Sequence, residues 1–439
     1  MFTRIFIDNF LGISAPVTFD FISESRNKDK SKSVIKIEDG IYINKMIGII
    51  GGNASGKTSI LTAITTVGQV LTSPILQFDV NDKIDIVSEL LEKERNPENM
   101  KIVREIIENI NTSSDISVQN LRRKHEDTII EVEMYIVSGI EELTGYYTYK
   151  LIFNGIDKKI KYEYLGFRKK YKEKPTTIIK ITDVKESQVY YINKYYKNIT
   201  DIEAERKTEL EEKYKYCKIF VEHYIENSAT IDTSEDCNIK ELKYRDWYKK
   251  SPDSLRTLVR VVDPKIKDVV IDTDGKYEEI LFILRDGSKI TRSMLSTGTE
   301  RFLNLIRYVN EVIDKNGVLV IDEIEQNMHK DLVEFIIKLF TEMTNKNAQI
   351  IFTTLSPDIF DIVDEYGKKI FKQDTIYILN SEEDDIQVDK LIDLQIDGSR
   401  VKGDASVSNL YKNKKISCHP DKEQINIFLH NFKNNLNDF

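Results

Sequence analysis

Cysteine, histidine and proline are scarce in this 439-residue sequence, which contains three, five and eight of them. The cysteines, Cys217, Cys237 and Cys418, are scattered and odd in number, and no Cys-x-x-Cys pair occurs. A disulfide framework is therefore not indicated, and the usage is typical of a reducing cytoplasm. The adjacent Cys418 and His419 could ligate a metal in principle, but isolated C-terminal residues are the simpler interpretation.

Long apolar runs and a strong charge imbalance are also missing. No stretch approaches the ~18 apolar residues of a membrane-spanning helix. Asp8 and Asn9 interrupt the apolar N-terminal stretch, so no signal peptide is indicated. Lys and Arg total 64 against 73 Asp and Glu, a net charge of −9, so any nucleic-acid site must be a local patch. We expect a cytoplasmic protein without a membrane partner.

The most informative segment is 51–58, Gly-Gly-Asn-Ala-Ser-Gly-Lys-Thr, which fits the P-loop pattern G-x-x-x-x-G-K-[ST]. An apolar stretch, 43–50, predicts a buried strand before it, and 58–70 predicts a helix after it. Glycines let backbone N–H groups cradle phosphate at a helix N-terminus. Lys57 would contact the β- and γ-phosphates, and Thr58 would offer its hydroxyl to Mg²⁺. The alternative, a glycine-rich turn without a ligand, does not account for the flanking strand and helix.

A second nucleotide motif follows an apolar strand at 318–321, which ends in Asp322 and Glu323. After a P-loop this pattern is typical of a Walker B strand. Asp322 would hold Mg²⁺ beside Thr58. Glu323 would polarise the attacking water as the catalytic base. The alternative, an edge strand with solvent-exposed acids, does not explain why four apolar residues precede them.

The third motif is Leu-Ser-Thr-Gly-Thr-Glu-Arg at 295–301, which opens a helix shortly before the Asp322 strand. Ser296 and Gly298 would form a second anion-binding helix N-terminus. An ordinary N-cap, made by Ser296 or Thr299 with Glu300 in the first turn, is the alternative. The position of the heptapeptide between P-loop and Walker B favours the first interpretation.

This order of motifs resembles the ATP-binding cassette (ABC) ATPases, in which an LSGGQ-like loop completes the site of a partner protomer. The pattern I-x-I-x-N-F-x-G at 5–12 is similar to the first strands of SMC/RecF-like and OLD-like members. One branch, the AAA-like ABC ATPases of bacterial anti-phage defence such as those of the AbiL, PARIS and Septu systems, resembles this chain further, at 258–268, 296–303, 322–329 and 403–420. The resemblance covers roughly 1–80, 125–170 and 255–420.

The resemblance implies a head-to-tail homodimer, or a larger homo-oligomer, that traps two ATP molecules. It implies that Thr58 and Asp322 hold Mg²⁺ and that Glu323 is the catalytic base. Ser296, Gly298 and Arg301 would act on the nucleotide of the partner protomer. The expected ATP-binding residues of the P-loop are Gly51, Asn53, Ala54, Ser55, Gly56, Lys57, Thr58 and Ser59.

One departure from the family concerns the segment Thr-Thr-Leu-Ser-Pro at 353–357, where the family pattern is T-T-H-S-P. The family histidine reaches the γ-phosphate, whereas Leu355 cannot donate a hydrogen bond. Hydrolysis is therefore expected to be slow, or to depend on Ser356 or Glu323 alone. His329, after the Walker B motif, is expected to pack or cap locally rather than to replace that histidine.

The alternation of helical and apolar strand segments predicts an α/β protein, an ABC-ATPase head with a mostly parallel P-loop sheet. Period-two patterns from 127 to 182, with an Asn154-Gly155 hairpin signal, predict an antiparallel β-subdomain. Helical spacing at 83–110 and 201–226 predicts helical insertions. The expected divisions are 1–80 (core with P-loop), 81–126 (helical), 127–182 (antiparallel), 183–252 (helical, a possible partner-binding arm) and 253–439 (core with signature and Walker B).

Two basic clusters could contact nucleic acid, at 122–125 and 168–174, and tyrosines alternate with lysines at 190–197. In a lysine-rich chain, solvated loops are the commoner explanation. An adaptor surface for a protein partner is equally open.

Three functions compete. The first is an ATP-gated sensor or scaffold of anti-phage defence that controls a separate effector or toxin, because no nuclease motif is visible and the segment after Leu355 is too short for the TOPRIM nuclease of OLD proteins. The second is a RecF/SMC-like ATPase of DNA repair or maintenance, against which the missing long coiled coil counts in part. The third, the motor of a membrane transporter, is disfavoured by the large insertions.

Overall fold

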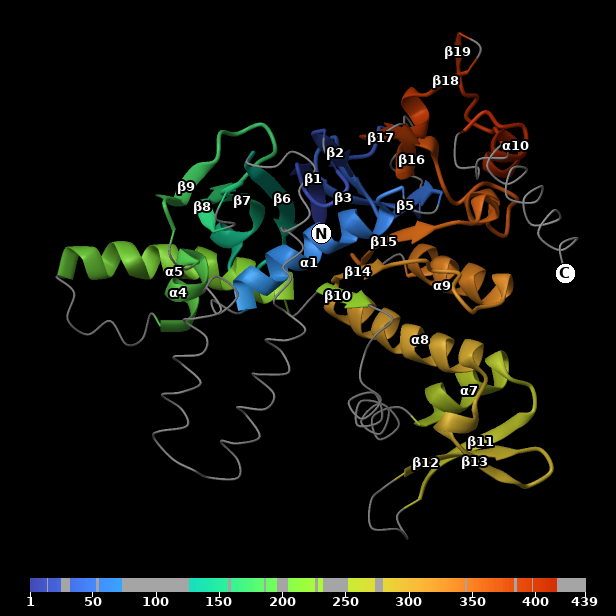
Figure 1. Ribbon diagram of the computed structural model, residues 1–439. Helices are drawn as coiled ribbons and strands as arrows, with labels where there is room; N and C mark the ends of the chain where they lie inside the picture. Colours follow the sequence, from blue (N-terminus) through green and yellow to red (C-terminus); the bar gives the residue numbers. More distant parts are fainter. Residues whose placement is uncertain are drawn as a thin grey trace, which may run out of the picture.

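The computed structural model describes residues 1–13, 15–24, 32–52, 55–72, 126–156, 159–184, 187–195, 204–225, 228–231, 252–272, 279–343, 346–382, 385–396 and 398–416. Figure 1 shows an α/β architecture in which the sheet that contains β5 (Met46–Gly51) and β14 (Val318–Ile321) lies between an antiparallel sheet on one side and a small three-stranded sheet on the other. In the described part of the chain, no helix is both long and apolar enough to cross a membrane.

The sheet that carries the P-loop has the strand order β10 (Ser228–Ile231), β14 (Val318–Ile321), β15 (Gln349–Thr354), β5 (Met46–Gly51), β16 (Ile376–Glu382), β17 (Asp385–Lys390). The first five strands run parallel, and β17 is antiparallel at the edge. Every residue of β5, β14 and β15 is buried, which explains their continuous apolar sequences. The predicted mostly parallel sheet is confirmed.

Helices cover both faces of this sheet. Helix α1 (Lys57–Thr72), which follows the P-loop, packs in one core cluster with β-strand residues such as Ile47 and Ile49. Helices α8 (Thr297–Lys315) and α9 (Lys330–Glu342) pack in a second cluster with Ile50 and Phe352. Alternate residues of the same strands thus face opposite layers.

The antiparallel sheet has the order β2 (Val17–Asp20), β1 (Phe2–Asp8), β6 (Thr128–Ile136), β7 (Gly145–Phe153), β8 (Ile160–Arg168), β9 (Thr176–Thr182). The predicted antiparallel block is confirmed, and the N-terminal strands β1 and β2 belong to it as well. A sheet that joins the expected segments 1–80 and 127–182 was not foreseen. The division of the chain into five segments stays a prediction.

Two helices, α4 (Gln188–Tyr195) and α5 (Ala204–Ile225), attach this sheet to the P-loop helix. The fully buried carboxylate of Glu163 accepts hydrogen bonds from Tyr149, from Ser187 and from the backbone N–H of Gln188 at the start of α4. At the end of α5, the Tyr224 hydroxyl donates to the carbonyl of Ile64 in α1 at 2.7 Å. The predicted amphipathic helix at 201–226 is confirmed from residue 204, and its buried face joins the same core as α1. The predicted helices of 83–110 lie outside the described residues.

A smaller unit leads into α8. Helix α7 (Pro252–Val262) packs on the sheet β11 (Ile266–Asp272), β12 (Glu279–Leu284), β13 (Lys289–Thr291), and a 3₁₀ turn, η6 (Arg292–Met294), connects it to the Ser296 loop. In Figure 1 this unit lies beyond the N-terminal half of α8. The structure also contains two short hairpins, β3 (Val34–Glu38) with β4 (Ile41–Asn44) and β18 (Gln395–Ile396) with β19 (Ser399–Arg400). Two further 3₁₀ turns are η4 (Glu141–Leu143) and η9 (Leu391–Asp393).

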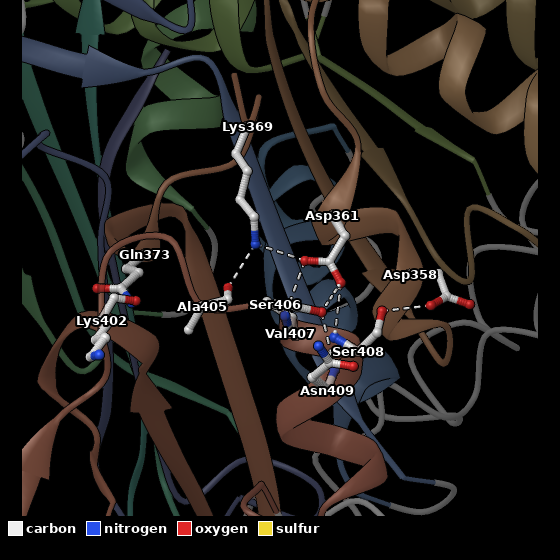
Figure 2. Close-up of polar contacts among 10 residues, drawn as sticks. All are labelled: Asp358, Asp361, Lys369, Gln373, Lys402, Ala405, Ser406, Val407, Ser408 and Asn409. Carbon is white, nitrogen blue, oxygen red and sulfur yellow. Dashed lines mark hydrogen bonds and ion pairs between the residues drawn. The ribbon is translucent and has the colours of Figure 1, made fainter. Parts of the chain in front are cut away.

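The C-terminal segment folds back onto the corner that follows β15. There α10 (Val407–Lys412) packs against η7 (Pro357–Asp361), while η8 (Gln373–Thr375) precedes β16. Figure 2 shows Asp361 at the centre of this contact, where it accepts from Ser406 and from the backbone N–H groups of Val407 and Ser408 and pairs with Lys369 at 2.8 Å. Half-burial works to raise the pKa of Asp361, but the bonds from Lys369, Ser408 and Ser406 outweigh it and hold that pKa well below its usual range.

Candidate functional site

The P-loop lies at the carboxyl end of β5, between β15 and β16 in the middle of the sheet. In parallel α/β sheets, this edge is where ligands bind. Gly56 has a φ of +87°, and a Cβ atom there would lie 2.2 Å from Ile386 Cδ1. Only glycine therefore fits this backbone position. Asn53 and Ala54, which we predicted to bind phosphate, lie outside the described residues.

The polar side chains of the loop are arranged for an anionic ligand. The ammonium of Lys57, which is only 6% exposed, donates to the carbonyl oxygens of Gly51 at 2.8 Å and Gly52 at 2.7 Å. The oxygens of a bound phosphate could take the place of these carbonyls as partners of the ammonium. Ser55 Oγ is buried without a hydrogen-bond partner among the described residues, a state that a bound phosphate would relieve. Ser59 lies half-buried in the first turn of α1.

The two predicted magnesium ligands meet across the sheet. Thr58 Oγ1, at the start of α1, donates to Asp322 Oδ2 at 2.7 Å. The other oxygen of the same carboxylate accepts a short hydrogen bond from Thr353 at the end of β15. A hydroxyl and a carboxylate within contact distance are the oxygen donors that Mg²⁺ takes from a protein when substrate phosphates supply the rest. The residues present therefore fit the ion.

Glu323 follows directly and has an unusual backbone. Its φ is +45°, in the left-handed region that side chains other than glycine rarely adopt. Its N–H donates to Thr353 Oγ1 at 2.8 Å, and the next N–H, of Ile324, donates to the Thr353 carbonyl at 3.1 Å. Thr353 thus fixes both acids of the motif. Sequence reasoning missed this role, although the threonine pair that ends β15 was a visible signal.

Arg301 lies within its own chain against the same turn. Its Nη2 donates to the carbonyl oxygens of Asp322 at 3.2 Å and of Glu323 at 2.9 Å. Burial lowers the pKa of the guanidinium, and the nearby acids Glu323, Glu325 and Asp322 oppose that effect. The sequence-based expectation was a contact with the partner's nucleotide. In this structure Nη2 is engaged with the two carbonyls, and the contact with the partner's nucleotide stays a prediction.

Ser296 and Gly298 form the start of α8. Ser296 is the N-cap, and its hydroxyl accepts from the backbone N–H of Thr299 at 3.1 Å, as the capping interpretation predicts. A Cβ atom at Gly298 would lie 2.6 Å from the carbonyl oxygen of Asn327, so the helix start packs tightly on the turn after the Walker B strand. The contact of both residues with a partner's nucleotide stays a prediction.

The corner after β15 carries Leu355, whose side chain is 40% exposed. Its backbone N–H donates to Glu325 Oε1 at 2.6 Å, which ties the corner to the Walker B turn. His329 is exposed and caps α9, where its Nδ1 accepts from the N–H of Asp331 at 3.4 Å. The expectation that His329 acts locally is confirmed.

The predicted basic patch at 168–174 needs a correction at its first residue. The Arg168 guanidinium pairs with Glu133 at 2.7 Å and lies 5.1 Å and 5.0 Å from the ring centres of Tyr146 and Tyr171. It is therefore part of the packed sheet rather than a free cation. The 122–125 cluster lies outside the described residues, as do residues 196–197, whereas 190–195 belong to α4.

Comparisons with known proteins agree with this geometry. Residues 1–360 match the model of the AAA ATPase domain. No curated protein matches the sequence significantly.

Solved structures similar to the chain include heads of SMC proteins. An SMC head bound to the C-winged helix domain of ScpA is 12% identical over 88% of this chain and 97% of that one, with a TM-score of 0.46. The SMC head domain from Thermotoga maritima is 10% identical over 90% and 99%, with a TM-score of 0.40. A third SMC head, with an extended coiled coil and bound to the C-terminal domain of ScpA derived from Pyrococcus furiosus, is 13% identical over 94% and 98%, with a TM-score of 0.41.

Proposed function

The chain belongs to the AAA ATPase domain family, and from this premise we propose that it binds ATP with Mg²⁺ at the P-loop and hydrolyses it. The observation that carries the proposal is the direct contact of Thr58 with Asp322, 264 positions apart in the sequence. This contact joins the P-loop to the Walker B strand. If the threonine–aspartate pair were only structural, the site would not also need a buried lysine bonded to the loop carbonyls. Nor would it need an acid of the catalytic type at the residue after the aspartate.

The roles of the side chains follow from their chemistry. Lys57 would exchange its two carbonyl partners for phosphate oxygens, and the N–H groups of the glycine-rich loop would bind the same anion. Thr58 and Asp322 would hold Mg²⁺, which neutralises charge that develops on the phosphates. Glu323, whose backbone N–H and carbonyl are both held, would accept a proton from the attacking water.

Turnover by this site should be slow. Leu355 stands where the related ATPases have a histidine, and the leucine side chain offers no hydrogen bond to a phosphate. One donor aimed at developing charge is worth roughly 10²–10³ in rate in other hydrolytic enzymes. Slow hydrolysis suits a switch that stays in its ATP state until it is triggered.

The finer proposal is a switch assembled from two copies of this chain. ATP would join two protomers head to tail, with the Ser296–Gly298 loop of one facing the P-loop of the other. The assembly would act as a sensor or scaffold of bacterial anti-phage defence and would control a separate effector protein. The signature-like motif and the resemblance of 258–268, 322–329 and 403–420 to ATPases of such systems support this proposal.

The test is ATP turnover by the purified chain, with particle mass measured with and without ATP and with Glu323→Gln as the control. We expect slow phosphate release that the variant loses, and an ATP-dependent doubling of mass, or more, that the variant retains. An absence of ATP binding would refute the ATPase proposal. An unchanged mass with bound ATP would refute the dimer alone, and turnover stimulated by DNA would favour a DNA-maintenance function instead.

A further inference from the structure

The catalytic turn at 322–324 has a backbone conformation that is unfavourable in the absence of its surroundings. Glu323 has a φ of +45°, where the Cβ of an L-residue crowds its own backbone. Such a conformation persists only when its surroundings over-determine it. The contacts that hold this residue are therefore the contacts that aim its carboxylate.

Two elements hold the turn from opposite sides. Thr353, at the end of β15, accepts the Glu323 N–H at 2.8 Å and fixes the N-terminal side of the residue. Arg301, in the second turn of α8, donates to the Glu323 carbonyl at 2.9 Å and to the Asp322 carbonyl at 3.2 Å. The peptide groups on both sides of the strained Cα are thus anchored by side chains from different elements.

Arg301 binds backbone carbonyl oxygens in preference to the carboxylates near it. Asp322, Glu323 and Glu325 all lie near enough to influence the guanidinium, yet Arg301 forms no ion pair with any carboxylate in the described part of the chain. One nitrogen serves two consecutive carbonyls instead. A guanidinium that binds carbonyl oxygens in this way forms no ion pair that would neutralise the nearby carboxylates.

We propose that Arg301 is a positioning residue that acts in cis: it holds the catalytic turn of its own chain in the conformation that aims Glu323. The inference rests on the proposed ATPase function and assigns to Arg301 a role other than contact with the partner's nucleotide. The geometry has a second consequence. Arg301 and Gly298 lie one helical turn apart on α8, and Gly298 packs on the Asn327 carbonyl. A displacement of the helix start by a partner would therefore reach the catalytic turn of the same chain.

The first test separates positioning from binding. We expect Arg301→Ala to lower kcat at least about tenfold and to change the ATP dissociation constant less than about threefold, because no P-loop contact is removed. Arg301→Lys, which can still donate to a carbonyl, should recover part of the rate. Lys315→Ala, which removes a positive charge at the other end of α8, is the matched control and should behave like the wild-type chain. Equal rates for Arg301→Ala and the control would overturn the proposal.

The second test distinguishes cis from trans action by mixing two impaired variants, Arg301→Ala and Glu323→Gln, and measuring the rate above that of each variant alone. In a head-to-tail dimer, a trans role would leave one intact composite site in every mixed dimer, and activity would return. A cis role leaves neither site intact, because the chain with a normal Glu323 lacks its own Arg301. We therefore expect no recovery, and recovery to about half the wild-type rate per mixed dimer would refute cis action.

A third measurement does not depend on turnover or on dimer formation. Amide hydrogen exchange of a peptide that covers 322–325 reports directly whether the turn is held, because the Glu323 and Ile324 N–H groups are bonded to Thr353. We expect faster exchange in Arg301→Ala than in the wild-type chain or in Lys315→Ala. Unchanged exchange would refute the inference even if ATP hydrolysis were confirmed. Faster exchange in a chain that does not hydrolyse ATP would support it while refuting the ATPase proposal.

Discussion

Lys57 is bonded within its own loop, and the proposed ATP binding would exchange these partners for phosphate oxygens. The residue is almost fully buried, and its ammonium is bonded to two carbonyls of its own loop. Hydrogen bonds to a charged group contribute about 1.5–3 kcal/mol each. The loop carbonyls therefore keep the buried charge satisfied until an anion replaces them.

Lys57→Ala should weaken ATP binding by about 100-fold or more, since two charge-assisted contacts worth roughly 3 kcal/mol together are lost and 1.4 kcal/mol is tenfold in affinity. Titration with a fluorescent ATP analogue measures this directly. The far-UV circular dichroism spectrum should not change, which would separate lost binding from unfolding. Normal affinity in the variant would contradict the P-loop assignment.

Leu355 gives the opposite kind of prediction, a gain. Leu355→His should raise the ATP turnover rate about tenfold at an unchanged dissociation constant, because the new imidazole can donate to a phosphate that leucine cannot reach by hydrogen bonding. Steady-state phosphate release measures it. Leu355→Ala is the matched control, since it removes the exposed apolar side chain without adding a donor. If both variants keep the wild-type rate, the corner is not a γ-phosphate contact in this protein.

The motifs predicted the chemistry of single residues well, but they did not predict which other residues contact them. Thr58, Asp322 and Glu323 were identified from the sequence, and the first two do meet. Thr353 and the cis contacts of Arg301 were not identified. A bond from a side chain to a backbone carbonyl far away in sequence depends on how two elements pack, and no spacing rule records it.

Helix α10 and the turn η7 form a coupled pair next to the Leu355 corner. Asp361 ends η7 and binds the first N–H groups of α10, so one carboxylate caps the helix and pairs with Lys369. The C-terminal segment is thereby fastened to the element that follows the proposed γ-phosphate corner.

Asp361→Asn should lower the apparent melting temperature by a few degrees at pH 7, because the capping charge and the ion pair are lost. The pKa of Asp361 is depressed in the folded chain, so its contribution is complete above the unfolded-state value of about 4 and declines as the pH falls below it. The difference between variant and wild type should therefore shrink between about pH 4 and pH 3. Thermal scans across that range test it.

Asp364→Asn is the control for this titration. Within the described part of the chain, the Asp364 carboxylate accepts from two backbone N–H groups of its own exposed turn, those of Tyr366 and Lys368. Its substitution should leave the melting temperature nearly unchanged at both pH values. An Asp361 variant that melts like this control at pH 7 would show that the α10 contact adds nothing to stability.

Strand type was predictable where strand pairing was not. The period-two pattern of 128–136 correctly indicated a strand of an antiparallel sheet. Nothing in residues 2–7 indicated that β1 would pair with β6 rather than with a strand of the P-loop sheet. Alternation specifies which side chains are buried, but many partners can satisfy the same pattern.

Helices α4 and α5 connect the antiparallel sheet to the helix that follows the P-loop. Glu163 anchors α4 from within the antiparallel sheet, and Tyr224 of α5 bonds to the P-loop helix α1. Burial raises the pKa of Glu163, and the bonds from Ser187, Tyr149 and the Gln188 N–H oppose it. A buried acid that accepts several hydrogen bonds holds its helix firmly only while all of them are satisfied.

Glu163→Gln should destabilise the chain by about 1–3 kcal/mol, because the amide has one acceptor oxygen instead of two and places its NH₂ group against bound donors. The apparent melting temperature measures this loss. ATP affinity should stay at the wild-type value, since Glu163 bonds to no P-loop residue that the structure describes. Glu211→Gln, an exposed change on α5, is the control. A stable Glu163 variant with weakened ATP binding would instead show that α4 and α5 set the shape of the nucleotide site.

The position of β5 in its sheet has a consequence for the chain during its synthesis. Both neighbours of this strand, β15 and β16, come from about 300 residues later in the sequence. Chains grow at roughly 5–20 residues per second, so the P-loop strand waits about 15–60 s for its partners. Until then, Asp322 and Thr353 have not reached Thr58. A truncated product that ends before β14 would thus carry the P-loop sequence without the Thr58–Asp322 contact of the proposed magnesium site.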